Sequence, residues 1–257
     1  MKIFIVGSGN LASHLLPALC KAGHEIIGLH SRNISKARKL CSQNKVPFHA
    51  HLDQALPCDF VFLLVSDDAI EKISTSFLNW KNTVLVHCSG AADIDRIKFP
   101  KNKRAVFYPL QTFSTSQSIL SFRNIPLIIE SESKSVKEKL ETLAHSLSDS
   151  VHFMNSKKRL SLHMAAVFIN NFSNHMAVIA EEICSKNKTD YHLLKPLMIK
   201  TAENAFPNPS AAQTGPAKRN DKKTIEKHLQ ILNRILPEER KLYLHLTNNI
   251  LNRNNKK

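Results

Sequence analysis

Apolar and polar positions change their spacing a little past the middle of the chain. Up to about residue 150, short apolar runs bounded by polar or small residues recur, which is typical of strands that alternate with helices around a buried sheet. Beyond about residue 155, apolar residues recur every three or four positions, as in amphipathic helices. We therefore predict an α/β domain over residues 1–154, with a mostly parallel, doubly wound sheet, and an all-α domain over residues 155–257.

The predicted strands are short runs rich in Ile, Val, Leu and Phe. They cover residues 2–6, 24–32, 46–50, 59–66, 82–90, 104–110 and 124–130. In an open parallel sheet, ligands bind beyond the carboxyl ends of the strands. Ser66 and Asp67 follow one strand, Ser89 lies at the end of the next, and Gln111 follows a third. We expect these side chains to line a binding site.

The first strand runs directly into the glycine-rich string GSGNLA at residues 7–12. Gly7 would make the tight turn, Gly9 would let the backbone approach a pyrophosphate, and Ala12 replaces the third glycine of the dinucleotide-binding fingerprint. The helix that follows would direct its free N–H groups at the phosphates. The predicted cofactor-binding residues of this loop are Gly7, Ser8, Gly9, Asn10 and Leu11.

The end of the second strand distinguishes between the two nicotinamide cofactors. An NAD-binding unit usually places Asp or Glu there to hold the ribose 2′-hydroxyl. This chain has Ser31 and Arg32 instead. A hydroxyl and a guanidinium suit a 2′-phosphate, which a carboxylate would repel. The sequence therefore favours NADP(H); the alternative is that Arg32 only solvates the end of the strand.

Residues 156–186 contain no proline or glycine and predict one long helix with a broad apolar face. On a regular helix His163, Asn170 and Asn174 share the polar side, with Asn171 close by. Histidine can transfer a proton near neutral pH, and amides can orient a carbonyl group. We expect His163, Asn170 and Asn171 to act in catalysis and Asn174 to contact the substrate. The alternative is an ordinary solvated helix face.

The segment 206–221 predicts a stiff loop, because it contains three prolines and Gly215. It presents Arg219 and Asp221 just before the next predicted helix. Arg219 would clamp an anionic group of a substrate, whereas Asp221 is also a typical N-cap residue. Both interpretations of this loop stay open at the level of the sequence.

Composition excludes several other classes of protein. The net charge is +15, yet no basic segment has the pattern of a recognition helix or is interleaved with stacking aromatic residues, so we expect a solvated lysine-rich surface and no nucleic-acid partner. Such a charge would favour an anionic substrate. Five scattered cysteines and thirteen histidines without a His-Glu-x-x-His string predict no disulfide framework and no metal site. No apolar run approaches a membrane span or a signal peptide, and we expect a cytoplasmic protein.

Four strings of residues resemble motifs of an uncharacterised bacterial family. They are HCSG at 87–90, YPLQTF at 108–113, HMAAVFINNF at 163–172 and QTGPAKRND at 213–221. Its members join a Rossmann-like NADP-binding domain to a helical domain of unknown function, and they are related to pyrroline-5-carboxylate reductase and 6-phosphogluconate dehydrogenase. The resemblance spans essentially the whole chain, and it implies a homodimer formed through the helical domain. In β-hydroxyacid dehydrogenase relatives a lysine of the long helix transfers a proton; here His163 occupies the comparable place.

Together these observations predict an NADP-dependent oxidoreductase. It would transfer a hydride to or from a small carbonyl or imine substrate bound between the two domains. His163 would supply the proton, Arg219 would hold a substrate carboxylate, and Gln111 and Asn174 would complete the substrate site. The alternative is a non-catalytic NADPH sensor or regulator, which would need the glycine-rich loop and Arg32 but not His163.

Overall fold

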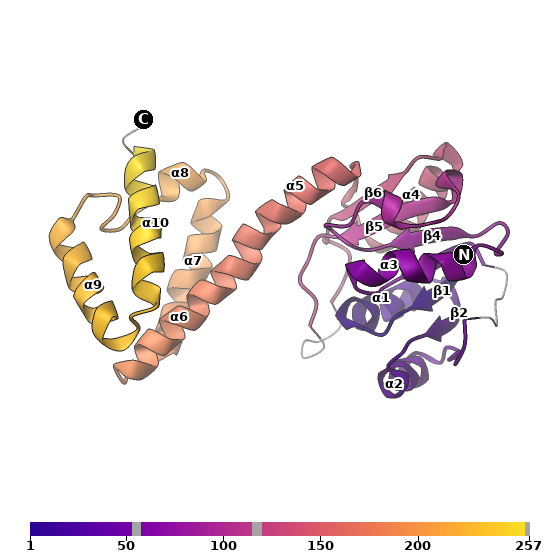
Figure 1. Ribbon diagram of the computed structural model, residues 1–257, viewed down its shortest axis with the longest axis horizontal. Coiled ribbons are helices and arrows are strands. Elements are labelled where there is room, and N and C mark those ends of the chain that lie inside the picture. Colours follow the sequence, from indigo (N-terminus) through magenta and orange to yellow (C-terminus); the bar gives the residue numbers. More distant parts are fainter. Residues whose placement is uncertain (53–57, 115–119, 255–257) are drawn as a thin grey trace. The chain divides into compact units, whose positions relative to one another are not determined.

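The computed structural model describes residues 1–52, 58–114 and 120–254. The chain divides into two compact units, Met1–Asn170 and Asn171–Lys257. The first unit is an α/β structure and the second is helical (Figure 1). The predicted fold class is thereby confirmed.

In the described part of the first unit, seven strands form one twisted sheet, in the order β2-β1-β3-β4-β5-β6-β7. The strands are β1 (Lys2–Val6), β2 (Glu25–His30), β3 (Phe60–Leu63), β4 (Val84–His87), β5 (Arg104–Pro109), β6 (Leu127–Ser131) and β7 (Val151–Phe153). Neighbouring strands from β2 to β5 are parallel, β6 runs antiparallel to β5, and β7 is parallel to β6. The strand predicted over residues 46–50 is wrong, since its only ladder contact is an isolated bridge between Leu29 and Phe48.

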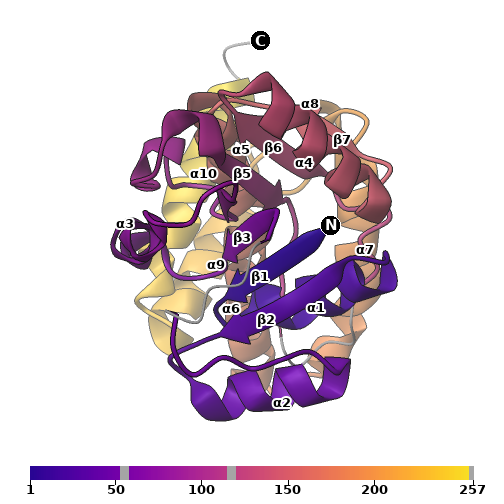
Figure 2. The same cartoon turned by 90° about the vertical axis from the view of Figure 1, so that its right-hand side faces the viewer.

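Helices cover both faces of the sheet (Figure 2). They are α1 (Asn10–Lys21), α2 (Ile34–Asn44), α3 (Asp67–Ser74) and α4 (Lys134–Leu147). Alternate residues of β1 face opposite sides of the sheet: Ile3 and Ile5 share an apolar cluster with residues of α1, α2 and α4, whereas Phe4 and Val6 share one with residues of α3 and the turn after it. The near-continuous apolar sequence of β1 follows from this burial on two sides.

The long helix predicted over residues 156–186 is present but is not regular. Helix α5 (Ser156–Val167) passes through a π-helical turn at Phe168–Phe172 into α6 (Ser173–Lys186). A π-turn closes i→i+5 hydrogen bonds and is therefore wider than an α-turn. Asn170 and Asn171 lie inside this turn, so the alignment of Asn174 with His163 on an ideal helix does not follow.

The second unit is helical and includes α6. The helices after α6 are α7 (Lys195–Ala205), α8 (Pro209–Ala212), α9 (Lys222–Ile235) and α10 (Glu239–Asn254), and a 3-10 turn at Tyr191–Leu194 precedes α7. In the first unit, 3-10 turns lie at Thr75–Phe77, Ile94–Arg96 and Lys101–Lys103. Helices α9 and α10 lie side by side, and α9 buries Ile225, Leu229 and Leu232. No helix within residues 1–52, 58–114 and 120–254 has both the length and the apolar character needed to span a bilayer.

Candidate active site

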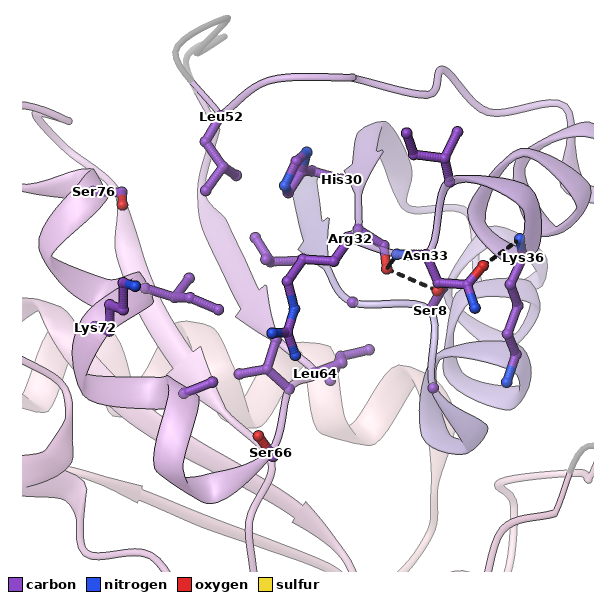
Figure 3. Close-up of a pocket in the computed structure, with 18 residues that line it drawn as sticks. Ser8, His30, Arg32, Asn33, Lys36, Leu52, Leu64, Ser66, Lys72 and Ser76 are labelled. Atoms are coloured by element: carbon purple, nitrogen blue, oxygen red, sulfur yellow. Dashed lines mark hydrogen bonds between the residues drawn. The ribbon is translucent and has the colours of Figure 1, made fainter.

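A cleft of about 1070 Å³ opens at the carboxyl ends of β1, β2 and β3 (Figure 3). Its walls come from the glycine-rich loop, from the turn between β2 and α2, and from α3. The predicted cofactor residues that line it are Gly7, Ser8, Gly9, Ser31, Arg32 and Ser66. The structure therefore brings residues from three separate strand ends to one cavity.

The two glycines of the loop differ in what they permit. Gly7 has φ of 119°, and a Cβ atom there would lie 2.0 Å from the carbonyl oxygen of Leu64. Gly9 is the N-cap of α1, and a Cβ atom there would meet nothing within 4 Å. Among the described residues no side chain caps α1, and the first turn of α1 contains no acidic residue. The helix thus presents N–H groups and a positive dipole end beside an open approach, which suits a phosphate.

Polar groups at the end of β2 face the cleft. The hydroxyls of Ser8 and Ser31 are 2.8 Å apart, and Asn33 caps α2 by accepting the N–H of Lys36 at 3.0 Å. Arg32 extends into the cleft (Figure 3), and no carboxylate among the described residues forms an ion pair with it. An unpaired guanidinium beside two hydroxyls is a suitable receptor for a phosphate monoester.

Two lysines that sequence reasoning missed also line this cleft. Lys36 lies in the first turn of α2, and Lys72 lies on α3 from the opposite wall. No sequence motif marks Lys72. It lines the same cleft as Arg32 because β3, which leads into α3, pairs with β1. Both lysines add to the positive potential around Arg32, which favours an anionic ligand.

Several predicted cofactor residues lie outside the cleft wall. Asn10 and Leu11 belong to the first turn of α1, and Asp67 begins α3. The Ser89 hydroxyl accepts the N–H groups of Ala91 and Ala92 at 3.1 and 2.8 Å. That bond pattern gives Ser89 a role in shaping the turn after β4, and its contact with a nicotinamide ring stays a prediction.

A second cluster of polar groups forms where β5 meets α5. Nδ1 of His163, on α5, is 3.1 Å from the hydroxyl oxygen of Tyr108, the penultimate residue of β5. Both rings pack on Gly90, where a Cβ atom would lie 2.6 Å from Nδ1 of His163 and 2.7 Å from Cζ of Tyr108. Gly90 is therefore needed for close approach. The sequence pointed to His163 as a catalytic residue, but it gave Tyr108, within the YPLQTF string, no role of its own.

The start of α5 is fixed to the sheet by a buried ion pair. The guanidinium of Arg159 is fully buried; it pairs with Glu130 and donates to the carbonyl oxygen of Ala92. Ser156 donates its N–H to Glu130 at 2.8 Å, and its hydroxyl accepts the N–H of Ile94 at 3.0 Å. His163 stands one helical turn beyond Arg159, so these bonds set its position relative to β5.

The same buried charge acts on His87, the last residue of β4. Burial, and then the nearby Arg159 guanidinium, lower the pKa of His87 from its ordinary 6.5 to about 3. Its Nδ1 accepts the N–H of Ser89 at 3.2 Å. His87 is therefore a neutral structural residue under ordinary conditions, and a role in proton transfer does not suit it.

The remaining predicted catalytic and substrate residues are spread over both units. In the first unit, Gln111 is exposed and accepts the N–H of Thr112, and Asn170 is exposed in the π-turn. The other three, which belong to the second unit, are Asn171, Asn174 and Arg219. Their placement near His163 stays a prediction.

The segment 206–221, predicted as a loop throughout, contains the short helix α8, and the structure supports one of the two interpretations given for its end. Asp221 caps α9 by accepting the N–H and the hydroxyl of Thr224 at 3.1 and 2.8 Å, and these bonds hold the pKa of Asp221 below its ordinary value. Arg219 is exposed two residues earlier. Across the described residues, no three His, Cys, Asp or Glu side chains gather as they would around a metal ion.

Comparisons with known proteins place this α/β fold and its cleft among NADP oxidoreductases. Residues 2–90 match the family described as NADP oxidoreductase, coenzyme F420-dependent, and residues 125–250 match a domain of unknown function, DUF2520. A provisionally named NADP oxidoreductase from Bacteroides fragilis is 32% identical, with 98% of each chain covered and a TM-score of 0.89. The chain belongs to this family, in which an NADP oxidoreductase domain precedes a DUF2520 domain.

More distant structures share the fold. A Thermotoga maritima protein is 24% identical over 99% of this chain and 98% of its own, with a TM-score of 0.73. An imine reductase from Myxococcus stipitatus, solved with NADP+, is 12% identical over 98% of this chain and 92% of its own, with a TM-score of 0.70. No curated protein matches the chain.

Proposed function

We propose that this protein is an NADP-dependent oxidoreductase that reduces a small carbonyl or imine compound. The observation that supports this most directly is the cleft at the sheet edge, where Arg32 stands unpaired beside Ser8 and Ser31. Membership in an NADP oxidoreductase family and the NADP+ complex of a structural relative point the same way. When bound, NADPH supplies the hydride.

Different residues of the cleft would bind different parts of the cofactor. The N–H groups at the start of α1 would bind the pyrophosphate next to Gly9, where the open backbone allows close approach. Arg32 would bind the 2′-phosphate, and Lys36 and Lys72, which line the same cleft, would add positive charge to it. Ser66, Asp67 and Ser89 follow the next strands and would lie toward the nicotinamide, as in other sheets of this type.

Proton transfer is assigned to His163. A carbonyl or imine that receives a hydride also needs a proton on its heteroatom, and a histidine is suited to supply it near neutral pH. His163 is partly exposed and is held against Tyr108 at the end of β5. Arg219 would bind a carboxylate of an anionic substrate, while Asn170, Asn171, Asn174 and Gln111 would orient the reacting group.

We further propose that two copies pair through the helical unit. Large apolar side chains of the second unit are exposed around α7, with Leu193 at 74%, Leu197 at 64% and Phe206 at 78% exposure. Such a patch is unusual on a monomer and is typical of an interface between proteins. Light scattering of the full chain should give a dimer mass, and Leu197→Lys should shift it toward the monomer.

The cofactor assignment is tested by titrating the protein with NADPH and NADH. Replacing Arg32 by Ser removes a charged hydrogen bond worth about 1.5–3 kcal/mol, so NADPH should bind roughly 10- to 100-fold more weakly. NADH lacks the 2′-phosphate, and its affinity should change little. Arg38→Ser is the matched control, because Arg38 lies on α2, outside the cleft wall, and stacks on Phe48.

Two results would contradict the assignment: equal losses for both nucleotides in Arg32→Ser, or no binding of either nucleotide to the unaltered chain. NADPH binding followed by reduction of carbonyl or imine test compounds would support an enzyme. Turnover that survives His163→Gln without loss would remove the histidine from the mechanism. NADPH binding with no turnover of any such compound would favour the sensor alternative.

A further inference from the structure

The pair formed by Tyr108 and His163 has one geometric property that a simple surface contact lacks. The hydroxyl of Tyr108 meets Nδ1 of the imidazole, at 3.1 Å, and the two rings are nearly perpendicular at 78°. Tyr108 is 9% exposed, while His163 is partly exposed. Within the described residues of the first unit, no group forms a hydrogen bond to Nε2 of His163. Nδ1 is therefore engaged on the protein side, and Nε2 is the nitrogen left for a ligand.

The direction of this hydrogen bond follows from the number of partners that the Tyr108 hydroxyl has. Among the described residues, Nδ1 of His163 is its one hydrogen-bond partner. If the O–H donates to Nδ1, the buried proton is satisfied. If Nδ1–H donated instead, the hydroxyl proton of this largely buried side chain would have no acceptor among the described residues, which costs more than an unused lone pair. Burial also raises the pKa of Tyr108, although the Arg159 charge opposes this, so the phenol keeps its proton at neutral pH.

The surroundings hold both rings in this arrangement. Arg159, one turn before His163, is fixed by Glu130 and by the Ala92 carbonyl, which sets the depth of α5 against β5. Gly90 leaves no room for a side chain between the backbone and the two rings. Rotation of His163 away from Tyr108 would leave the phenol proton without its acceptor. The arrangement is built into the fold and does not depend on a ligand.

We propose that Tyr108 is a positioning residue that holds His163 in the tautomer with its proton on Nε2, so that Nε2 is the proton donor of the active site. This role rests on the proposed reductase function, but the tautomer itself does not. In the reduction, the substrate carbon gains the hydride and the C=O or C=N electron pair moves to the heteroatom. The heteroatom takes the Nε2 proton, Nδ1 takes the phenol proton, and the Tyr108 phenolate regains a proton from water.

The tautomer can be read without any substrate from a two-bond ¹H–¹⁵N correlation spectrum of the full chain. At about pH 8 an ordinary histidine is neutral, and a fixed tautomer separates the two ring nitrogens widely. His163→Gln identifies the signal by its disappearance. We expect Nδ1 to be the unprotonated nitrogen. A spectrum with the proton on Nδ1 would overturn the proposal.

Two variants test what holds the tautomer. Tyr108→Phe removes the hydroxyl and keeps the ring, so both tautomers become populated and the gap between the two nitrogen shifts narrows. Gly90→Ala forces a Cβ atom into both rings and should have the same effect. Tyr243→Phe is the matched control. The Tyr243 hydroxyl is hydrogen-bonded to Nδ1 of a different, exposed histidine, His228, at 2.8 Å in the second unit, so this variant should leave the His163 signal unchanged. An unchanged His163 signal in Tyr108→Phe would overturn the role of Tyr108.

The turnover of Tyr108→Phe tests the role of Tyr108 separately from the proposed reductase function. A general acid contributes roughly 10²–10⁴-fold to a rate, and a misdirected acid should lose a large part of it. With any carbonyl or imine compound that the unaltered chain reduces, Tyr108→Phe should lower kcat about 10- to 100-fold while NADPH affinity stays the same. Turnover equal to the unaltered chain would overturn the proposal and leave the reductase intact. Failure of the unaltered chain to bind NADPH would instead remove the reductase.

Discussion

Replacing His87 by Asn should make the first unit markedly more resistant to acid. His87 is fully buried, and burial together with Arg159 lowers its pKa from 6.5 to about 3. Between these two values the unfolded chain binds a proton that the folded chain refuses, so stability falls as the pH falls. Asn cannot be protonated there, and its shorter side chain still offers an oxygen to the Ser89 N–H.

The size of the effect follows from the two pKa values. Going from about pH 7 to about pH 4.5, protonation of His87 in the unfolded chain should cost the folded state about 2.5 kcal/mol. Because about pH 4.5 lies above the folded pKa, this difference is determined almost entirely by the unfolded pKa of 6.5. Other groups contribute equally to both proteins, so the comparison between them isolates His87.

Urea unfolding followed by tryptophan fluorescence measures this difference. Trp80 is the single tryptophan of the chain and packs on Phe77 and Phe4 at ring distances of 4.8 and 5.8 Å, so it reports on the first unit. His145→Asn, on an exposed position of α4, is the control and should lose stability with pH as the unaltered chain does. Equal acid losses in His87→Asn and the unaltered chain would refute the reasoning.

Further outcomes concern the glycine-rich loop and the cysteines. Gly7→Ala should lower the free energy of unfolding by at least about 2 kcal/mol, because Ala disfavours a positive φ and its Cβ would clash with the Leu64 carbonyl oxygen. Chemical denaturation measures this loss, and unchanged stability would contradict it. Gly9→Ala should keep stability within about 0.5 kcal/mol yet weaken NADPH binding in titrations, and unchanged affinity would argue against pyrophosphate contact there. Burial raises the pKa of Cys58 to about 11 and also shields its thiol, so iodoacetamide at about pH 8 should label Cys58 far more slowly than partly exposed Cys184 in mass spectra. Similar labelling rates would mean that the first unit opens readily.

Sequence patterns predicted the α/β unit and the glycine-rich turn after β1 well, because both depend on local rules. A buried parallel strand is apolar throughout, and a positive φ after it requires glycine, as at Gly7. The strand predicted over residues 46–50 failed for a related reason. Its apolar residues pack against the edge of the sheet, but they do so with one bridge instead of a ladder. An apolar run alone does not distinguish a strand of the sheet from a segment that only packs against its edge.

The candidate site was only partly predictable, since its members meet through tertiary packing. Tyr108 and His163 are 55 residues apart, and neither position carries a local signal of the other. Lys72 joins the cleft through the order of the strands, which local patterns do not determine. The π-turn at Phe168–Phe172 also has no signature in the spacing of apolar residues. A regular helical wheel therefore aligned Asn174 with His163, although the turn between them is wider than an α-turn.

The buried pair between Glu130 and Arg159 has a consequence for how this protein can be divided. A fragment ending at residue 154 would keep the carboxylate on β6 but lose the Arg159 guanidinium and the Ser156 groups that bind it. A fragment that continues through α5 would keep the pair, together with Tyr108 and His163. Recombination between relatives faces the same restriction: a helical module grafted at the start of α5 would have to bring its own arginine and histidine to a sheet already shaped to receive them.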